Sequence, residues 1–235
     1  MKLLTTAMGE ATSDYSVHRI DPVIAVVFGA IAFAIVLAAQ LSVPRYIAPA
    51  YWAAIVMVAV FGTMCADVLH VRFGVPYAAS AAVFSVALAI VFVTWYRVEG
   101  TLSIHSITTT PRELFYWAAV LTTFALGTAV GDLTAYTLHL GFFSAGLAFV
   151  GVFAIPAIAY RLGWLGGVAA FWSAYVVTRP LGASFADWMG VPRSLGGLDW
   201  GRGTVALALT ALIVVFVAYL TFARPDVPAP AAAQA

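Results

Sequence analysis

Residues 117–132 read WAAVLTTFALGTAVGD, a stretch that contains one tryptophan, two glycines and a single charge, the aspartate at its end. The stretch lies in a longer apolar run, Leu114–Leu138, which is long enough to cross the roughly 30 Å hydrocarbon layer of a membrane as a helix. Six further runs of this kind are Pro22–Leu41, Tyr51–Leu69, Tyr77–Tyr96, Phe142–Tyr160, Trp164–Asp187 and Thr204–Phe222. Because these runs do not alternate between apolar and polar residues, they predict helices and not the strands of a barrel.

The composition of the whole chain is typical of a membrane protein. Of its 235 residues, 63% are hydrophobic and 9% are charged, whereas a soluble domain carries about 25% charged residues. The net charge of +1 leaves no basic face for nucleic acid. The single cysteine, Cys65, excludes an internal disulfide. We expect one all-α transmembrane bundle over residues 1–223, surrounded by a lipid bilayer, and a disordered Pro/Ala-rich tail at residues 224–235.

The glycine and the terminal aspartate of the opening stretch recur in a fixed register. The pattern G-x-x-x-x-D occurs four times, at Gly9–Asp14, Gly62–Asp67, Gly127–Asp132 and Gly182–Asp187. A tryptophan stands 15 residues before the aspartate in three copies, as Trp52, Trp117 and Trp172, and in the first copy this position would fall before Met1. Because a second apolar span follows each motif, we predict four two-helix repeats with seven full spans and an N-terminal half span. Their approximate bounds are 1–45, 46–100, 112–162 and 163–223.

Two helices in each repeat bring every repeat into the membrane in the same direction. The repeats are therefore predicted to be parallel and related by an axis along the membrane normal. All four motif aspartates then lie at one depth, on one side. Because tryptophan favours the interface and 15 helical residues span about 22 Å, we expect each aspartate in the far part of the hydrocarbon layer.

The sequence resembles a bacterial membrane-protein family that is defined by a repeat of unknown function, number 347 in the domain-of-unknown-function series. The matching stretches are GEATSDY (9–15), EGTLSIHSI (99–107), RELFYWAAVLTTFALGTAVGDLTA (112–135) and TRPLGASFADW (178–188). The one departure is the missing tryptophan of the first repeat. The resemblance implies four tandem repeats, each with two transmembrane regions and a tryptophan, and we expect the chain in a bacterial inner membrane. It implies no biochemical activity.

Polar side chains inside these spans are the candidate binding or transport residues, because such groups are costly in a membrane. Residues one helical turn apart share a helix face, so Glu10, Thr63 and Thr128 each lie one turn below a motif aspartate. Around a common axis the carboxylates and the two hydroxyls would form a cage of hard oxygen ligands, which suits Mg²⁺, Mn²⁺, Ca²⁺ or protons. The predicted metal ligands are Glu10, Asp14, Asp67, Asp132 and Asp187.

Crowded carboxylates repel one another, so some of them hold protons when no cation is bound. Cation binding would then release protons. This chemistry favours a small secondary transporter that exchanges a divalent cation, its substrate, for protons, and it assigns no resident cofactor.

Arg179 is the other charge within a span and stands directly before Pro180. It could serve as a counter-charge to the aspartates, or it could bind a small organic anion. An arginine inside the cage would weaken the divalent-cation hypothesis and favour a substrate that carries a carboxylate or a phosphate.

A third reading comes from another class of protein. Aspartates near helix ends can cap the following segment, and the chain would then be a membrane scaffold or an accessory subunit without transport activity. No G-x-S-x-G, H-E-x-x-H, P-loop or Rossmann pattern occurs, so we do not expect an enzyme. A homo-oligomer stays open.

Overall fold

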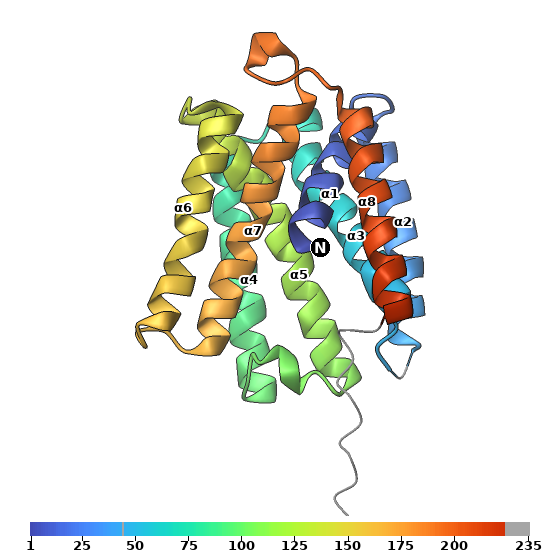
Figure 1. Cartoon of the computed structure of the whole chain (residues 1–235), viewed down its shortest axis with the longest axis vertical. Coiled ribbons are helices and arrows are strands. Elements are labelled where there is room, and N and C mark those ends of the chain that lie inside the picture. The colour runs from blue at the N-terminus through green and yellow to red at the C-terminus, as the bar shows by residue number, and fades with distance from the viewer. Residues whose placement is uncertain (44, 224–235) are drawn as a thin grey trace, which may run out of the picture.

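The computed structural model describes residues 1–43 and 45–223, and its long helices form one bundle (Figure 1). These helices are α1 (Lys2–Val17), α2 (Pro22–Leu41), α3 (Ala48–Asp67), α4 (Tyr77–Glu99), α5 (Thr110–Asp132), α6 (Gly141–Arg161), α7 (Gly167–Gly190) and α8 (Arg202–Ala223). Two π-helical turns, η1 (Val68–Arg72) and η3 (Leu133–Thr137), follow α3 and α5 directly, and two 3₁₀ turns are η2 (Ile104–Ser106) and η4 (Arg193–Leu195). The described residues contain no strand, so the all-α prediction is confirmed. The tail predicted to be disordered, 224–235, lies outside the described residues.

Within the described residues, six helices are long and apolar enough to cross a membrane. They are α2, α3 with η1, α4, α5 with η3, α6 and α8. Large apolar side chains such as Phe28, Ile35 and Leu207 face outward from them, which suits lipid and not water. The chain is therefore an integral membrane protein. The helix α7, which contains most of the predicted span Trp164–Asp187, does not belong to this group of six, so the count of seven full spans stays a prediction.

The helices are arranged as an inner ring and an outer layer. The inner ring consists of α1, α3, α5 and α7, which carry the four motifs, and α7 closes the ring by packing against α1. Each outer helix packs mainly on the inner helix of the following repeat. These pairs are α2 on α3, α4 on α5, α6 on α7 and α8 on α1. Neighbouring helix pairs therefore interlock around one central axis.

The motif glycines allow the inner helices to approach closely. A Cβ atom on any of them would collide with the next inner helix, at Ala59 for Gly9, Phe124 for Gly62, Arg179 for Gly127 and Thr6 for Gly182. The contacted residue stands three positions before the next motif glycine in every case. Small residues serve membrane helices in this way because they bring backbones together. One contact thus recurs four times around the ring, which supports the predicted parallel repeats.

The first inner helix is short. α1 has 16 residues, and its N-terminal end lies near the middle of the bundle (Figure 1). It is shorter than α3, α5 and α7, which have 20, 23 and 24 residues, and it carries the Gly9–Asp14 motif. Because α1 is not among the helices long and apolar enough to cross a membrane, the half span at the N-terminus stays a prediction.

The motif tryptophans of the third and fourth repeats face the protein interior. Trp117 and Trp172 are 2% and 5% exposed and pack with Tyr116 and Tyr175 in an aromatic core. The indole N–H of Trp172 donates to the backbone carbonyl of Leu102 at 2.9 Å. Because a buried indole needs such an acceptor, internal packing accounts for these tryptophans. The expectation that they sit at the interface is not needed to explain their register.

Candidate functional site

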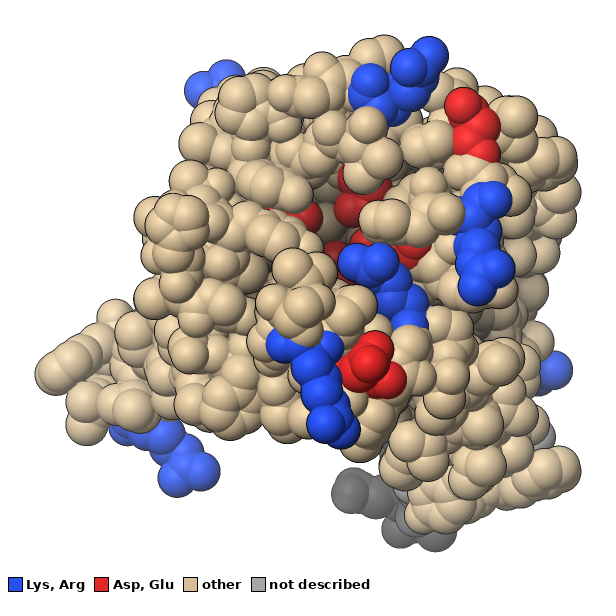
Figure 2. Space-filling view, turned by 90° about the horizontal axis from the view of Figure 1, so that it is seen from above, with Lys and Arg blue, Asp and Glu red and all other residues tan. Residues whose placement is uncertain are grey.

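Carboxylates gather in a hollow at one end of the inner ring. Figure 2 looks at this end and shows acidic side chains deep in a depression, with a basic side chain at its edge. The residues that form this group are Glu10 and Asp14 of α1, Asp67 of α3, Asp132 of α5 and Asp187 of α7. The four motif aspartates therefore come together from all four inner helices, as the register predicted.

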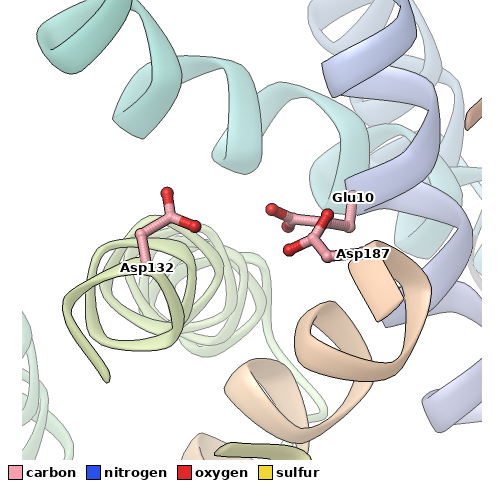
Figure 3. A group of neighbouring side chains, drawn as sticks. All are labelled: Glu10, Asp132 and Asp187. Carbon is pink, nitrogen blue, oxygen red and sulfur yellow. The ribbon is translucent and has the colours of Figure 1, made fainter. Parts of the chain in front are cut away.

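The carboxylates form two groups that share Glu10. In the first group Glu10, Asp132 and Asp187 each place one oxygen atom within 4.8 Å of the others (Figure 3). Glu10, Asp14 and Asp67 form the second group by the same measure. Two oxygens bound to one hard cation at about 2.0–2.6 Å lie at most about 5 Å apart. Either group could therefore provide three ligands to a single ion.

The two groups differ in how far their carboxylates already have partners. Asp14 forms an ion pair of 2.8 Å with Arg202, and Asp67 accepts a hydrogen bond of 2.5 Å from Ser13. Within residues 1–43 and 45–223, no hydrogen bond or ion pair reaches the carboxylate of Asp132 or Asp187. Two of the three carboxylates of the first group are therefore available to bind a cation.

Two of the motif aspartates do not make the hydrogen bonds that a helix cap requires. Asp67 and Asp132 directly precede the turns η1 and η3, and neither side chain makes a capping hydrogen bond. Asp21 shows what such a cap looks like in this chain, because its carboxylate accepts hydrogen bonds from the amides of Val23 and Ile24 at the start of α2.

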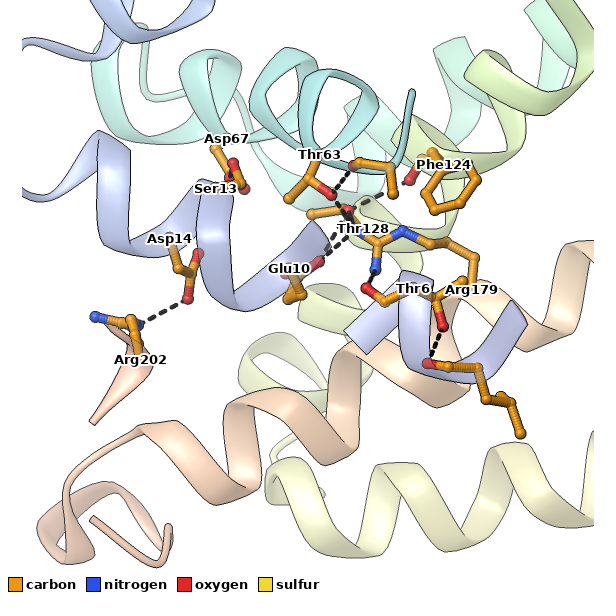
Figure 4. Close-up of polar contacts among 12 residues, drawn as sticks. Thr6, Glu10, Ser13, Asp14, Thr63, Asp67, Phe124, Thr128, Arg179 and Arg202 are labelled. Carbon is orange, nitrogen blue, oxygen red and sulfur yellow. Dashed lines mark hydrogen bonds and ion pairs between the residues drawn. The ribbon is translucent and has the colours of Figure 1, made fainter. Parts of the chain in front are cut away.

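Arg179 lies beneath the carboxylates, where all four inner helices meet (Figure 4). From α7, its guanidinium donates to the Glu10 carboxylate at 2.5 Å, to the Thr128 hydroxyl at 2.8 Å, to the Thr63 hydroxyl and to the carbonyl of Thr6 at 3.2 Å. Arg179 is 0% exposed, and its Nε has no acceptor in the described part of the chain. The sequence predicted a motif aspartate as the partner of this arginine, whereas in the structure its carboxylate partner is Glu10.

The two predicted hydroxyl residues lie next to this arginine. The positions of Thr63 and Thr128 correspond to that of Glu10 in their repeats, one residue after the motif glycine, and all three side chains accept from Arg179. Their oxygens compensate a guanidinium that would be expensive to bury alone. In this structure the hydroxyls thus lie at the floor of the hollow and accept hydrogen bonds from the Arg179 guanidinium.

Two basic residues near the site were not among the predicted site residues. Arg202, at the start of α8, pairs with Asp14. The ammonium group of Lys2 lies over the ring of Tyr175 and 5.5 Å from the ring of Phe124, and the same Phe124 ring lies 5.2 Å from the guanidinium carbon of Arg179. Neither residue stands in the motif register, so only the fold shows that it belongs near the axis.

A separate cavity of about 440 Å³ lies away from the carboxylates. It is formed by the connection around η2 and by parts of α6 and α7, and its lining is mostly apolar, with Leu102, Ile104, Val168 and Phe171 among the residues. No aspartate or glutamate lines it, so it does not contribute to the cation chemistry considered above.

Comparison with known proteins identifies the family but no activity. The sequence profile described as Repeat of Unknown Function (DUF347) matches residues 50–101, 115–162 and 170–226. These segments correspond to the pairs α3–α4, α5–α6 and α7–α8. The pair α1–α2 is not matched, although Gly9 makes the same contact in the ring as the other motif glycines. No curated protein and no solved structure matches the chain. Because the matches cover more than half of the sequence, the chain belongs to the DUF347 repeat family.

Proposed function

We propose that this protein is a small secondary transporter that moves a divalent metal cation in exchange for protons through the carboxylate-lined hollow. One observation carries the proposal. Glu10, Asp132 and Asp187 hold oxygen atoms within 4.8 Å of one another inside the membrane bundle, and two of the three carboxylates have no partner in the part of the chain that is described. Charged side chains inside a membrane protein are kept mostly where they bind or relay charge.

The charges in the hollow favour a cation over an anion. Five carboxylates face the guanidinium groups of Arg179 and Arg202, and Lys2 lies nearby at the ring of Phe124, so at least two negative charges stay uncompensated when all groups are ionised. Asp187 stands eight residues beyond Arg179 on α7, about 12 Å closer to the opening. An anion would therefore meet the carboxylates before it reached a guanidinium that Glu10 already holds. This argues against the organic-anion alternative, although an arginine within the cage was the feature expected to favour it.

The ligand atoms favour a hard cation. Both carboxylate groups consist of oxygen donors, without histidine or cysteine among the residues that the structure describes. Oxygen ligands of this kind suit Mg²⁺, Mn²⁺ or Ca²⁺, whereas softer ions prefer nitrogen and sulfur. The substrate proposed here is thus a hard divalent cation.

Proton exchange follows from the crowding of like charges. Carboxylates only a few ångströms apart do not all stay ionised when no cation lies between them, and such sites take up and release protons as a unit. A bound divalent cation would favour the fully ionised state and expel these protons.

The expected membrane is the inner membrane of a bacterium.

The scaffold alternative rests on the second group of carboxylates. The Asp14–Arg202 pair ties α1 to α8, and the hydrogen bond from Ser13 to Asp67 ties α1 to α3. These contacts can stabilise the bundle without any transport. They do not account for the free carboxylates of Asp132 and Asp187.

Cation flux into vesicles that contain the purified protein tests the proposal. Native protein, Asp132→Asn and Asp21→Asn are compared for Mn²⁺, Mg²⁺, Ca²⁺ and Zn²⁺ under an imposed proton gradient. Asp21→Asn is the matched control, because Asp21 only caps α2 and asparagine also caps helices. We expect proton-driven flux of a hard cation in the native and Asp21→Asn proteins and its loss in Asp132→Asn. Absence of flux for all four ions with folded native protein would refute the proposal and leave the scaffold reading.

A further inference from the structure

The proposed cation site shares one of its carboxylates with a guanidinium. Glu10 belongs to both carboxylate groups and also forms the 2.5 Å ion pair with Arg179. Glu10 is 1% exposed and Arg179 is 0% exposed, so water screens neither charge. A metal ion bound to Glu10, Asp132 and Asp187 would therefore compete with the guanidinium for the same carboxylate.

We propose that Arg179 is a tethered substitute for the transported cation. In the empty protein the guanidinium occupies Glu10, and a divalent cation that enters the hollow takes Glu10 from it. This inference rests on the proposed function and adds to it the group that competes with the substrate. It makes Arg179 a residue that sets cation affinity, with no need for the arginine to touch the ion.

The contacts of Arg179 allow such an exchange of partners. Among the described residues Glu10 is its one charged partner, while its other acceptors are the neutral hydroxyls of Thr63 and Thr128 and the carbonyl of Thr6. These neutral acceptors remain when Glu10 turns to a metal ion. The guanidinium carbon also lies 5.2 Å from the ring of Phe124, and an aromatic face stabilises a desolvated cation. The arginine can therefore give up one partner and keep the rest.

The aliphatic part of the same side chain is held in place. The Cβ and Cγ atoms of Arg179 fill the space against Gly127 where a larger residue of α5 would otherwise stand. An exchange of partners would therefore involve the guanidinium end of the side chain. Arg179 could thus compete with the cation for Glu10 while the rest of its side chain stays in place.

The exchange also accounts for how Glu10 keeps a partner when no cation is bound. A buried carboxylate without any partner is expensive, and Arg179 provides a partner to Glu10 whenever the substrate is absent. Arg202 cannot do this, because it pairs with Asp14 and its side chain is 26% exposed, where solvent weakens an ion pair. The two arginines of the hollow thus offer an internal comparison.

Binding of Mn²⁺ to the purified full-length protein at one fixed pH tests the inference. Isothermal titration compares native protein with Arg179→Gln, Arg179→Lys and Arg202→Gln. We expect Arg179→Gln to bind Mn²⁺ at least about tenfold more tightly, the change that follows when about 1.4 kcal/mol of competition is lost. Arg179→Lys keeps a positive charge on a shorter side chain, so its affinity for Mn²⁺ should lie between those of the native protein and Arg179→Gln. Arg202→Gln removes the same charge from the same hollow and should tighten binding clearly less.

The outcomes separate this inference from the function on which it rests. If native protein binds no Mn²⁺, Mg²⁺ or Ca²⁺, the proposed function fails and the inference with it. If native protein binds Mn²⁺ and a folded Arg179→Gln binds it no more tightly, only the inference is overturned. Equal tightening by Arg202→Gln would also overturn it, because the effect would then be that of net charge. Should Arg179→Gln not fold, Arg179→Lys decides, since an affinity at or below the native value contradicts a competitor.

Discussion

Removal of the negative charge from Glu10 should destabilise the protein strongly. Glu10→Gln keeps the shape of the side chain but leaves the guanidinium of Arg179 buried without a charged partner. The two side chains are 0% and 2% exposed and lie 2.5 Å apart, so water cannot replace the lost carboxylate. Breaking such a buried pair at one partner costs about 3–5 kcal/mol. We therefore expect the free energy of unfolding of Glu10→Gln to fall by about this amount.

The measurement is reversible unfolding in mixed detergent micelles, followed by tryptophan fluorescence. Asp14→Asn is the matched control, because the pair of Asp14 with Arg202 is partly exposed and should contribute about 1 kcal/mol or less. The double variant Glu10→Gln/Arg179→Met removes both charges and should recover most of the lost stability. A loss below about 1 kcal/mol for Glu10→Gln, the range of exposed pairs, would show that solvent reaches the guanidinium. The Glu10–Arg179 pair would then not be shielded from water.

Three further predictions concern the ring and the site. Gly127→Ala should destabilise the bundle by about 1–3 kcal/mol in the same assay, because the new Cβ collides with the stem of the buried arginine. Gly151→Ala, where a Cβ meets nothing within 4 Å, should leave stability unchanged or raise it by up to about 1 kcal/mol, and equal losses would contradict the ring contact. Ser13→Ala, which removes the buried 2.5 Å hydrogen bond to Asp67, should cost about 1.5–3 kcal/mol, whereas the exposed Ser42→Ala should cost clearly less. Mn²⁺ at 100 times its dissociation constant should raise the free energy of unfolding by about 2.7 kcal/mol, and an unchanged melting temperature would count against a cation site.

The local features of the sequence determined the class of the fold and the register of the site. The helical segments and their connections follow from the length of each apolar run, because a membrane-spanning segment must satisfy its own backbone hydrogen bonds. The spacing between each motif glycine and its aspartate placed the polar groups on corresponding helices. Both are properties of short stretches of chain, so the printed sequence is enough to read them.

The tertiary structure alone decided which groups meet. Arg179 could be assigned to an acidic partner or to an anionic substrate from the sequence, and its partner Glu10 lies 169 residues away along the chain. The sequence also left open which aspartates already have hydrogen-bond or ion-pair partners, and it gave no sign that Trp172 packs inside the protein. These outcomes depend on closure of the ring between the first and the last inner helix. Residues that meet between α1 and α7 lie far apart in the chain, and no short sequence pattern relates them. Their contacts are therefore determined only by the packing of all four inner helices.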